Sequence, residues 1–176
     1  SLSNNLPGFV VLTSKSGRNP QPIASRQWAS GCLPSKFQGV EFNAKGAPVH
    51  YVDNPGGITD ARQRQVIEAV KKMDQLRDMQ VHDQEIDSKI AQYEMAFRMQ
   101  SSVPDLMDIS DEPKSVLEEY GATVGDGSYA SNCLLARRLA ERGVRFIQLY
   151  HKGWDHHGGL KKFMGVSCGS TDQPTA

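Results

Sequence analysis

Short apolar runs alternate with polar, glycine-rich and proline-rich stretches along this chain, and several of the runs predict β-strands. Residues 8–12 and 48–52 are rich in β-branched or aromatic side chains, which favours extended structure. Residues 144–150 predict the most regular strand, because only two polar side chains interrupt an apolar, β-branched run. Residues 28–42 mix glycine and proline with apolar positions, so we expect an irregular but packed segment there.

A helical repeat of apolar positions dominates the middle of the chain. Thr59 can cap a helix over about residues 60–80, whose apolar stripe is Val66, Val70 and Met73. A second helix starts near residue 83 and should end before Pro104, because proline disfavours the helical state in the preceding residue. Its apolar face consists of Ile86, Ile90, Tyr93 and Phe97. The two segments form either one long helix or a hairpin that breaks at residues 82–83.

Two shorter helices follow, and a glycine ends each of them. The first runs from about residue 111 to Tyr120, before Gly121, and the second from its cap Ser128 to about Arg142. The order helix, glycine, strand over residues 128–150 is typical of a βαβ unit. We therefore predict an α/β fold with long amphipathic helices.

Composition narrows the choice of partners. The chain has 176 residues, 38% hydrophobic and 23% charged, which is typical of one globular domain or a large part of one. The 20 Lys and Arg balance the 20 Asp and Glu, which argues against a nucleic-acid or anionic-membrane partner. No apolar run is long enough to span a membrane. The 3 cysteines are far apart without a CxxC pair, so neither a thiolate zinc site nor a disulfide framework is expected.

Both ends of the sequence look internal. The chain opens at Ser1 in a loop-like stretch, and it closes at Ala176 without a terminal cap. No export signal precedes the first predicted strand. We therefore expect residues 1–176 to be part of a single domain that is truncated at both ends.

The candidate chemistry is concentrated in the loop after the last predicted strand, which carries His151, Asp155, His156 and His157. Ligands in α/β folds bind at the carboxyl ends of the strands, and carboxylates and imidazoles bind divalent metals. Asp155 and His157 are alternate residues, so both point the same way in an extended loop while His156 points elsewhere. A metal site is one interpretation. The other is an exposed loop in which Asp155 caps a following helix.

Other polar patterns favour structural interpretations. Glu94 and Arg98 are spaced as an ion pair on one helix face. Arg137, Arg138 and Glu141 are expected to form a solvated helix face with an internal ion pair rather than an anion clamp. Residues 30–35 contain two serines but no base at useful spacing, so they do not indicate a catalytic nucleophile.

Five blocks along the chain together resemble one bacterial protein family, the domain-of-unknown-function family 1501, whose members are often labelled sulfatase-like and placed near the alkaline phosphatase superfamily. The resemblance covers essentially the whole chain. The blocks are LPGFVVL (residues 6–12), WASGCLPSKFQGV (28–40), YEMAFRMQ (93–100), NCLLARRL (132–139) and GWDHHG (153–158).

The resemblance implies an alkaline-phosphatase-like α/β/α sandwich with a mostly parallel sheet. It also implies a metal-dependent hydrolase of sulfate or phosphate esters, acting on a small-molecule or saccharide ester. The family's Trp-Asp-x-His pattern falls on Trp154, Asp155 and His157, so a divalent metal is expected to bind Asp155 and His157, with His151 as a third participant. The family's later Glu-Phe-Gly-Arg and Asp-His blocks would lie beyond residue 176, and the nucleophile before residue 1. We therefore expect this segment to be inactive alone. An exported or periplasmic location is also implied.

Two hypotheses compete with catalysis. The first is a non-catalytic secreted binding or scaffold protein that retains the fold, because function is carried by the site and not by the fold. The second is an assembly segment built on helices 60–101. If strands that neighbour residues 144–150 are missing, that strand has an uncovered edge, and we expect low solubility of the isolated chain.

Overall fold

The computed structural model describes residues 4–14, 23–49, 56–81 and 84–176, apart from the side chains of residue 60 and of residues 77–81 and 84–87. The strands are β1 (Phe9–Thr13), β2 (Val40–Phe42) and β3 (Phe146–Tyr150). The α-helices are α1 (Asp60–Val81), α2 (Gln84–Met107), α3 (Lys114–Tyr120), α4 (Tyr129–Glu141) and α5 (Leu160–Thr175), and the 3-10 helices are η1 (Ser25–Trp28) and η2 (Ser35–Phe37).

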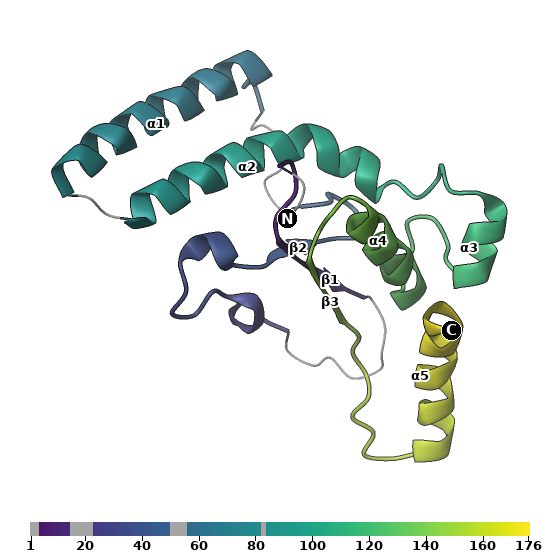
Figure 1. Cartoon of the computed structure of the whole chain (residues 1–176). Coiled ribbons are helices and arrows are strands. Elements are labelled where there is room, and N and C mark those ends of the chain that lie inside the picture. The colour runs from purple at the N-terminus through teal and green to yellow at the C-terminus, as the bar shows by residue number, and fades with distance from the viewer. Residues whose placement is uncertain (1–3, 15–22, 50–55, 82–83) are drawn as a thin grey trace.

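The three strands form one parallel sheet in the order β2-β1-β3 (Figure 1). Val10 of β1 is in register with Val40 of β2 and with Ile147 of β3. Strands that are far apart in the sequence therefore run side by side and end at the same edge. The prediction of an α/β fold with a parallel sheet and long helices is confirmed.

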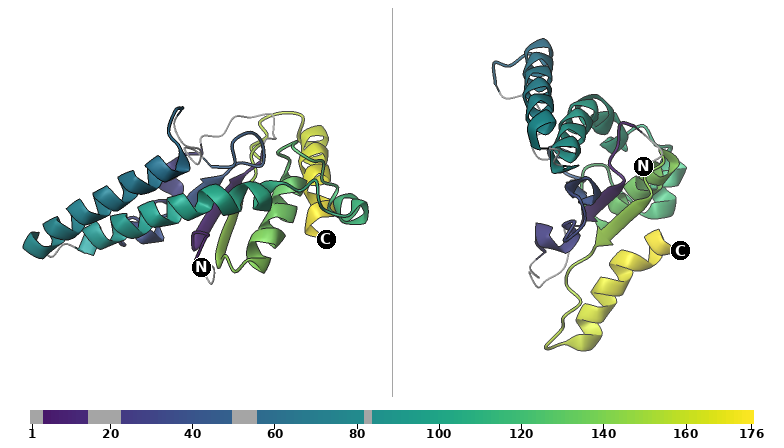
Figure 2. Two further views of the ribbon diagram at one scale, coloured as in Figure 1. Left: turned by 90° about the horizontal axis from the view of Figure 1, so that it is seen from above. Right: turned by 60° about the vertical axis from the view of Figure 1, so that its left-hand side comes forward.

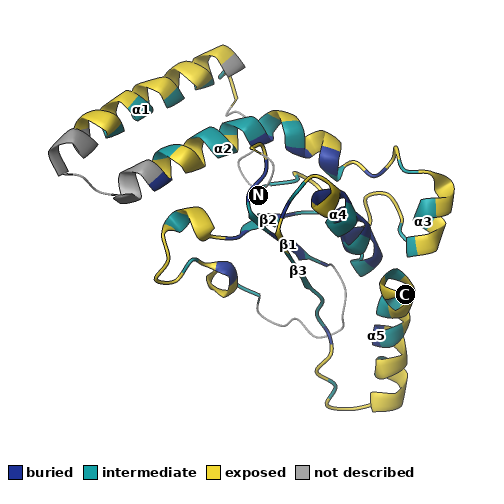
Figure 3. Cartoon of the chain, viewed as in Figure 1, coloured by how far each residue is buried: buried dark blue, intermediate teal, exposed yellow. Residues whose placement is uncertain are grey.

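The two faces of the sheet differ. Val10 and Leu12 of β1 belong to the main hydrophobic core, together with buried leucines of α4 and the buried end of α2. Side chains alternate along a strand, so Phe146 lies on the opposite face, where it is 68% exposed. On that face the ring of Trp28 from η1 packs 5.8 Å from the ring of Tyr150. Helix α4 and the end of α2 therefore cover the face that carries Val10 and Leu12, and Figure 3 shows buried residues in both helices.

Local capping chemistry explains where several helices begin and end. The Ser128 hydroxyl accepts a hydrogen bond from the backbone N–H of Ser131 at 3.1 Å, so it caps α4 as predicted. The Thr59 hydroxyl accepts from the N–H of Arg62 at 3.3 Å at the start of α1. Gly121 ends α3 with φ 65°, a left-handed conformation that glycine adopts without strain.

Helices α1 and α2 form an antiparallel hairpin that projects away from the sheet (Figure 2). Lys71 of α1 forms an ion pair with Glu94 of α2, which also pairs with Arg98 at 3.8 Å as its spacing predicted. The predicted apolar stripe of α1 is not buried, since Met73 is 70% exposed. None of the helices in the described part of the chain is both long and apolar enough to cross a membrane.

Two predicted boundaries were wrong. Residues 48 and 49 are not in a strand, whereas Val40–Phe42, expected to be irregular, forms β2; the rest of the predicted strand over 48–52 lies outside the described residues. Pro104 lies inside α2 rather than beyond its end. Burial of Val103 and Leu106 on either side of Pro104 holds this last stretch against the core, and this packing outweighs the local preference. The hairpin alternative for the two long helices is confirmed.

Candidate functional site

The carboxyl edge of the sheet brings together residues that are far apart in the sequence. Ser14 directly follows β1 and His151 directly follows β3, whose last residues Thr13 and Tyr150 are in register. Parallel pairing therefore places Ser14 beside His151, with the Ser14 hydroxyl 2.8 Å from Nδ1 of the imidazole. Ser14 is 1% exposed, so this contact lies beneath the surface of the edge.

His151 is held by contacts on several sides. Its Nε2 lies 3.3 Å from the hydroxyl of Ser170 in α5, and the Tyr129 ring at the start of α4 packs against the imidazole at 5.0 Å between centroids. The Trp154 ring meets it at 6.0 Å. Burial lowers the pKa of His151 from its ordinary value, so the imidazole is neutral at pH 7. A neutral imidazole is the form that binds metals.

Asp155 and His157 lie together further along the loop. Nε2 of His157 is 2.9 Å from Oδ2 of Asp155, and the two side chains are 83% and 56% exposed. His156 points elsewhere: its Nε2 is 3.3 Å from the hydroxyl of Ser167 in α5, and its ring stacks on Phe163. The predicted alternation of the loop is therefore confirmed.

The interpretation of Asp155 as a helix cap was wrong. A helix does follow the loop, but α5 begins at Leu160 and its N-cap residue is Gly159, with φ 61°. Asp155 instead faces His157. Helix α5 was not predicted from the sequence, because its glycines and late proline are poor helix formers. The contacts of α5 with α3 and α4 place Ser167 and Ser170 against the loop of residues 151–158, which we call the histidine loop.

The donor chemistry of this edge fits a divalent metal in part. Asp155 and His157 offer one carboxylate and one imidazole on the same side of the loop. Within the described part of the chain, no three His, Cys, Asp or Glu side chains gather closely enough to hold a metal, so His151 does not join the pair. Catalytic zinc sites usually have three protein ligands.

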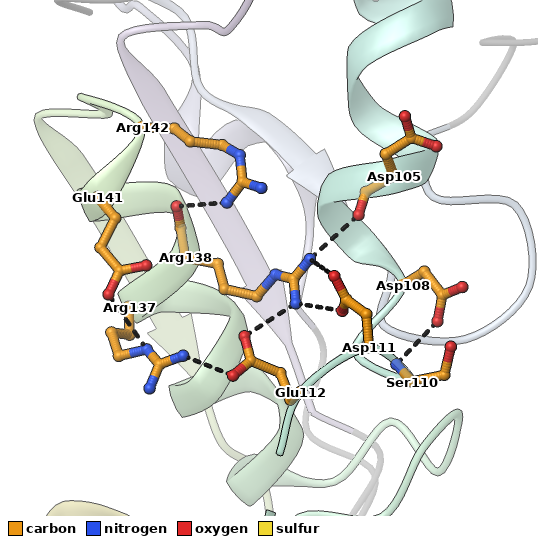
Figure 4. Close-up of polar contacts among 9 residues, drawn as sticks. All are labelled: Asp105, Asp108, Ser110, Asp111, Glu112, Arg137, Arg138, Glu141 and Arg142. Atoms are coloured by element: carbon orange, nitrogen blue, oxygen red, sulfur yellow. Dashed lines mark hydrogen bonds and ion pairs between the residues drawn. The ribbon is translucent and has the colours of Figure 1, made fainter. Parts of the chain in front are cut away.

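A second polar cluster surrounds Arg138 of α4. The prediction that Arg138 lies on a solvated helix face was wrong. Arg138 is only 3% exposed rather than solvated. Its Nη1 donates to Asp111 at 2.7 Å and to Glu112 at 2.9 Å, and its Nη2 donates to the Asp105 carbonyl at 3.1 Å (Figure 4). Arg137 forms the expected ion pair with Glu141 at 3.4 Å and a second with Glu112 at 2.8 Å.

The cluster joins α4 to the segment between α2 and α3. Burial lowers the pKa of Arg138, but the hydrogen bonds and charges of Asp111 and Glu112 outweigh this and raise it overall. The hydrogen bond from Arg138 holds the pKa of Asp111 below its ordinary value. One sequence signal could have revealed the buried guanidinium: Arg138 has the spacing of the apolar stripe formed by Leu134, Leu135 and Leu139. We assign this cluster a structural role.

Comparison with known proteins identifies the family. No curated protein matches the chain, and no solved structure matches it. The profile of one family, described as "Protein of unknown function (DUF1501)", matches residues 1–176. This match spans both strand ends that form the carboxyl edge and the entire histidine loop. The chain therefore belongs to the DUF1501 family.

Proposed function

We propose that this protein is part of a metal-dependent hydrolase of sulfate or phosphate esters, with its metal site at the carboxyl edge of the sheet. The observation that carries the proposal is the pairing of Asp155 with His157 at 2.9 Å, on an exposed loop that follows a parallel strand. Ligands of α/β proteins bind at this edge. The alkaline-phosphatase-like relationship of the fold is part of the same proposal.

In this proposal Asp155 and His157 hold the metal. When bound, a divalent ion would stabilise negative charge on the ester oxygens and lower the pKa of a nucleophile. The third participant, His151, has the environment of a metal-binding histidine, because its Nδ1 has a fixed partner in Ser14. Its Nε2 now faces Ser170, so a shift of the loop or of α5 is needed before it can bind. The nucleophile is proposed to lie outside residues 1–176.

Metal analysis of the full natural chain tests the proposal. The wild type is expected to retain zinc or manganese after dialysis, and Asp155→Ala and His157→Ala each to lose most of it. His156→Ala is the matched control, since His156 contacts Ser167 instead of Asp155. Hydrolysis of p-nitrophenyl phosphate and p-nitrophenyl sulfate should decrease in parallel with bound metal. Unchanged metal content in both Ala variants would exclude this site.

The exposed apolar side chains of the α1–α2 hairpin favour a second candidate, a non-catalytic binding or scaffold protein. Met73 and Leu76 of α1 are 70% and 65% exposed. Exposed apolar patches of this kind mark interaction surfaces. Absence of both bound metal and hydrolysis, together with association that Met73→Lys abolishes, would support this candidate over the hydrolase.

A further inference from the structure

A cavity lies at the opposite end of the sheet from the histidine loop. It occupies about 400 Å³ between α2, η2 and the amino ends of β1 and β2, where Gly8 and Gly39 precede the two strands. This volume falls in the range of small-molecule sites, about 300–1,000 Å³. The five residues of β1 separate the cavity from Ser14 by roughly 16 Å. The cavity is therefore a separate site, independent of the proposed metal-binding edge.

The inner wall of the cavity is apolar. Ala91, Met95 and Met99 line it from successive turns of α2, and Val40 lines it from β2. Met99 is 4% exposed and belongs to the core, whereas Ala91 is exposed at the rim. Methionine side chains are flexible and polarisable, so such a wall adapts to aliphatic or aromatic groups.

The opposite wall adds a positive charge and an unused hydroxyl. Among the described residues that line the cavity, Lys36 of η2 alone carries a formal charge. No carboxylate in the described segments forms an ion pair with Lys36, whose Nζ lies 5.3 Å from the centroid of the Phe37 ring. The neighbouring Ser35 hydroxyl is buried and has no hydrogen-bond partner among the described residues. Buried hydroxyls normally have a partner, so Ser35 points to a missing acceptor.

We propose that this cavity binds a small monocarboxylate with an apolar body. The carboxylate would pair with Lys36 and, after rotation of the Ser35 side chain toward the cavity, accept from the Ser35 hydroxyl. The body would pack on Met95 and Met99. A cation is disfavoured by Lys36, and a strongly polar ligand by the methionine wall. The site thus selects for an amphiphilic anion of the size of a medium-chain fatty acid.

Methyl NMR of protein labelled with ¹³C-methyl methionine tests the proposal, with sodium octanoate below its micelle concentration as the probe. Octanoate is expected to shift the methyl signals of Met95 and Met99, while that of Met164 in α5 stays unchanged. Lys36→Gln should weaken octanoate binding about fivefold, as expected for loss of one exposed ion pair. Its affinity for octanol should change less than about twofold, because octanol lacks the charge.

Two variants complete the design. Ala91→Phe places a ring at the exposed rim and is expected to abolish the octanoate-induced shifts without disturbing the core. Lys89→Gln removes an exposed charge from α2 outside the cavity, and it should leave octanoate affinity unchanged. The proposal is overturned if octanoate leaves Met95 and Met99 unshifted. It is also overturned if Lys36→Gln binds octanoate as tightly as the wild type, or if Lys89→Gln weakens binding as much as Lys36→Gln does.

Discussion

Ser14 and His151 connect the carboxyl ends of β1 and β3, with the serine hydroxyl 2.8 Å from Nδ1 of the imidazole. The same hydroxyl donates to the Tyr150 carbonyl at 3.1 Å. The Ser170 hydroxyl at Nε2 also has a second contact, since it donates to the Ser167 carbonyl at 2.7 Å. A neutral imidazole has one N–H and one acceptor nitrogen, so His151 donates to one of these serines and accepts from the other. Ser14 and Ser170 together therefore hold the His151 ring between the strand ends and α5.

Replacement of Ser14 tests how much this connection stabilises the fold. We expect Ser14→Ala to lower the free energy of unfolding by about 1–2 kcal/mol, because Nδ1 of His151 loses its buried hydrogen-bond partner. Urea denaturation followed by circular dichroism measures the change. Ser101→Ala is the control, because Ser101 is exposed and its hydroxyl donates to the Arg98 carbonyl within the same helix. An equal decrease in the free energy of unfolding of both variants would show that the buried contact stabilises the fold no more than the exposed one.

Stability should also depend on pH through His151. Burial lowers the pKa of the folded-state imidazole below the ordinary 6.5 of the unfolded chain. As the pH falls below 6.5, the unfolded chain takes up a proton that the folded chain does not, so the free energy of unfolding decreases. The decrease stops once the pH is below the folded-state pKa.

We therefore expect urea denaturation in the presence of a chelator to show lower stability at about pH 5.5 than at about pH 7. His151→Gln should show a smaller decrease than the wild type. His157→Gln serves as the matched control, because its ring is 83% exposed, and it should keep the wild-type decrease. The same decrease in His151→Gln as in the wild type would exclude His151 as the source.

Elements that depend on neighbouring residues could be predicted from the sequence. Elements that depend on contacts between distant parts of the chain could not. Ser128 and Gly121 were recognised because caps depend on neighbouring residues alone. The short strand β2 was missed because its pairing of Val40 with Val10 links segments thirty positions apart. Pro104 was expected to end α2, but the buried residues on both sides of it continue the helix.

The candidate site shows the same division. Alternation along an extended loop correctly placed Asp155 with His157 and directed His156 away. The sequence could not predict that His151 would turn toward Ser14 and Ser170, because those serines come from β1 and α5. Likewise, no local pattern connects Arg138 with Glu112, whose contact depends on the packing of α4 against the segment before α3.

The Arg138 cluster predicts unequal effects for its two carboxylates. Glu112 is 11% exposed, whereas Asp111 is 69% exposed. We expect Glu112→Ala to lower the free energy of unfolding by about 3 kcal/mol, because the buried guanidinium of Arg138 loses the more buried of its two carboxylate partners. Asp111→Ala should have a much smaller effect, since water can solvate its side of the guanidinium. Thermal denaturation of the two variants measures the difference. Equal destabilisation would contradict the conclusion that Glu112 is the more buried partner of Arg138.

Asn132 and Ser131, adjacent in α4, predict opposite outcomes for removal of a buried polar group. Asn132 is fully buried, and neither side-chain polar atom has a hydrogen-bond partner among the described residues. The Ser131 hydroxyl, also buried, donates to Asp126 at 2.7 Å. Asn132→Leu keeps the heavy-atom skeleton and removes an unpaired amide, so we expect the free energy of unfolding to rise by about 1 kcal/mol.

Ser131→Ala should instead lower the free energy of unfolding by about 1 kcal/mol, because the buried hydrogen bond to the Asp126 carboxylate is lost, although the Ser128 N–H still donates to that carboxylate. Urea denaturation of both variants at one pH gives the two signs directly. A loss of stability in Asn132→Leu would mean that an ordered water or a ligand satisfies the amide in solution. In that case Asn132, one turn after the cap of α4 and three residues from the Tyr129 ring that packs on His151, would become a candidate for the polar lining of the carboxyl edge.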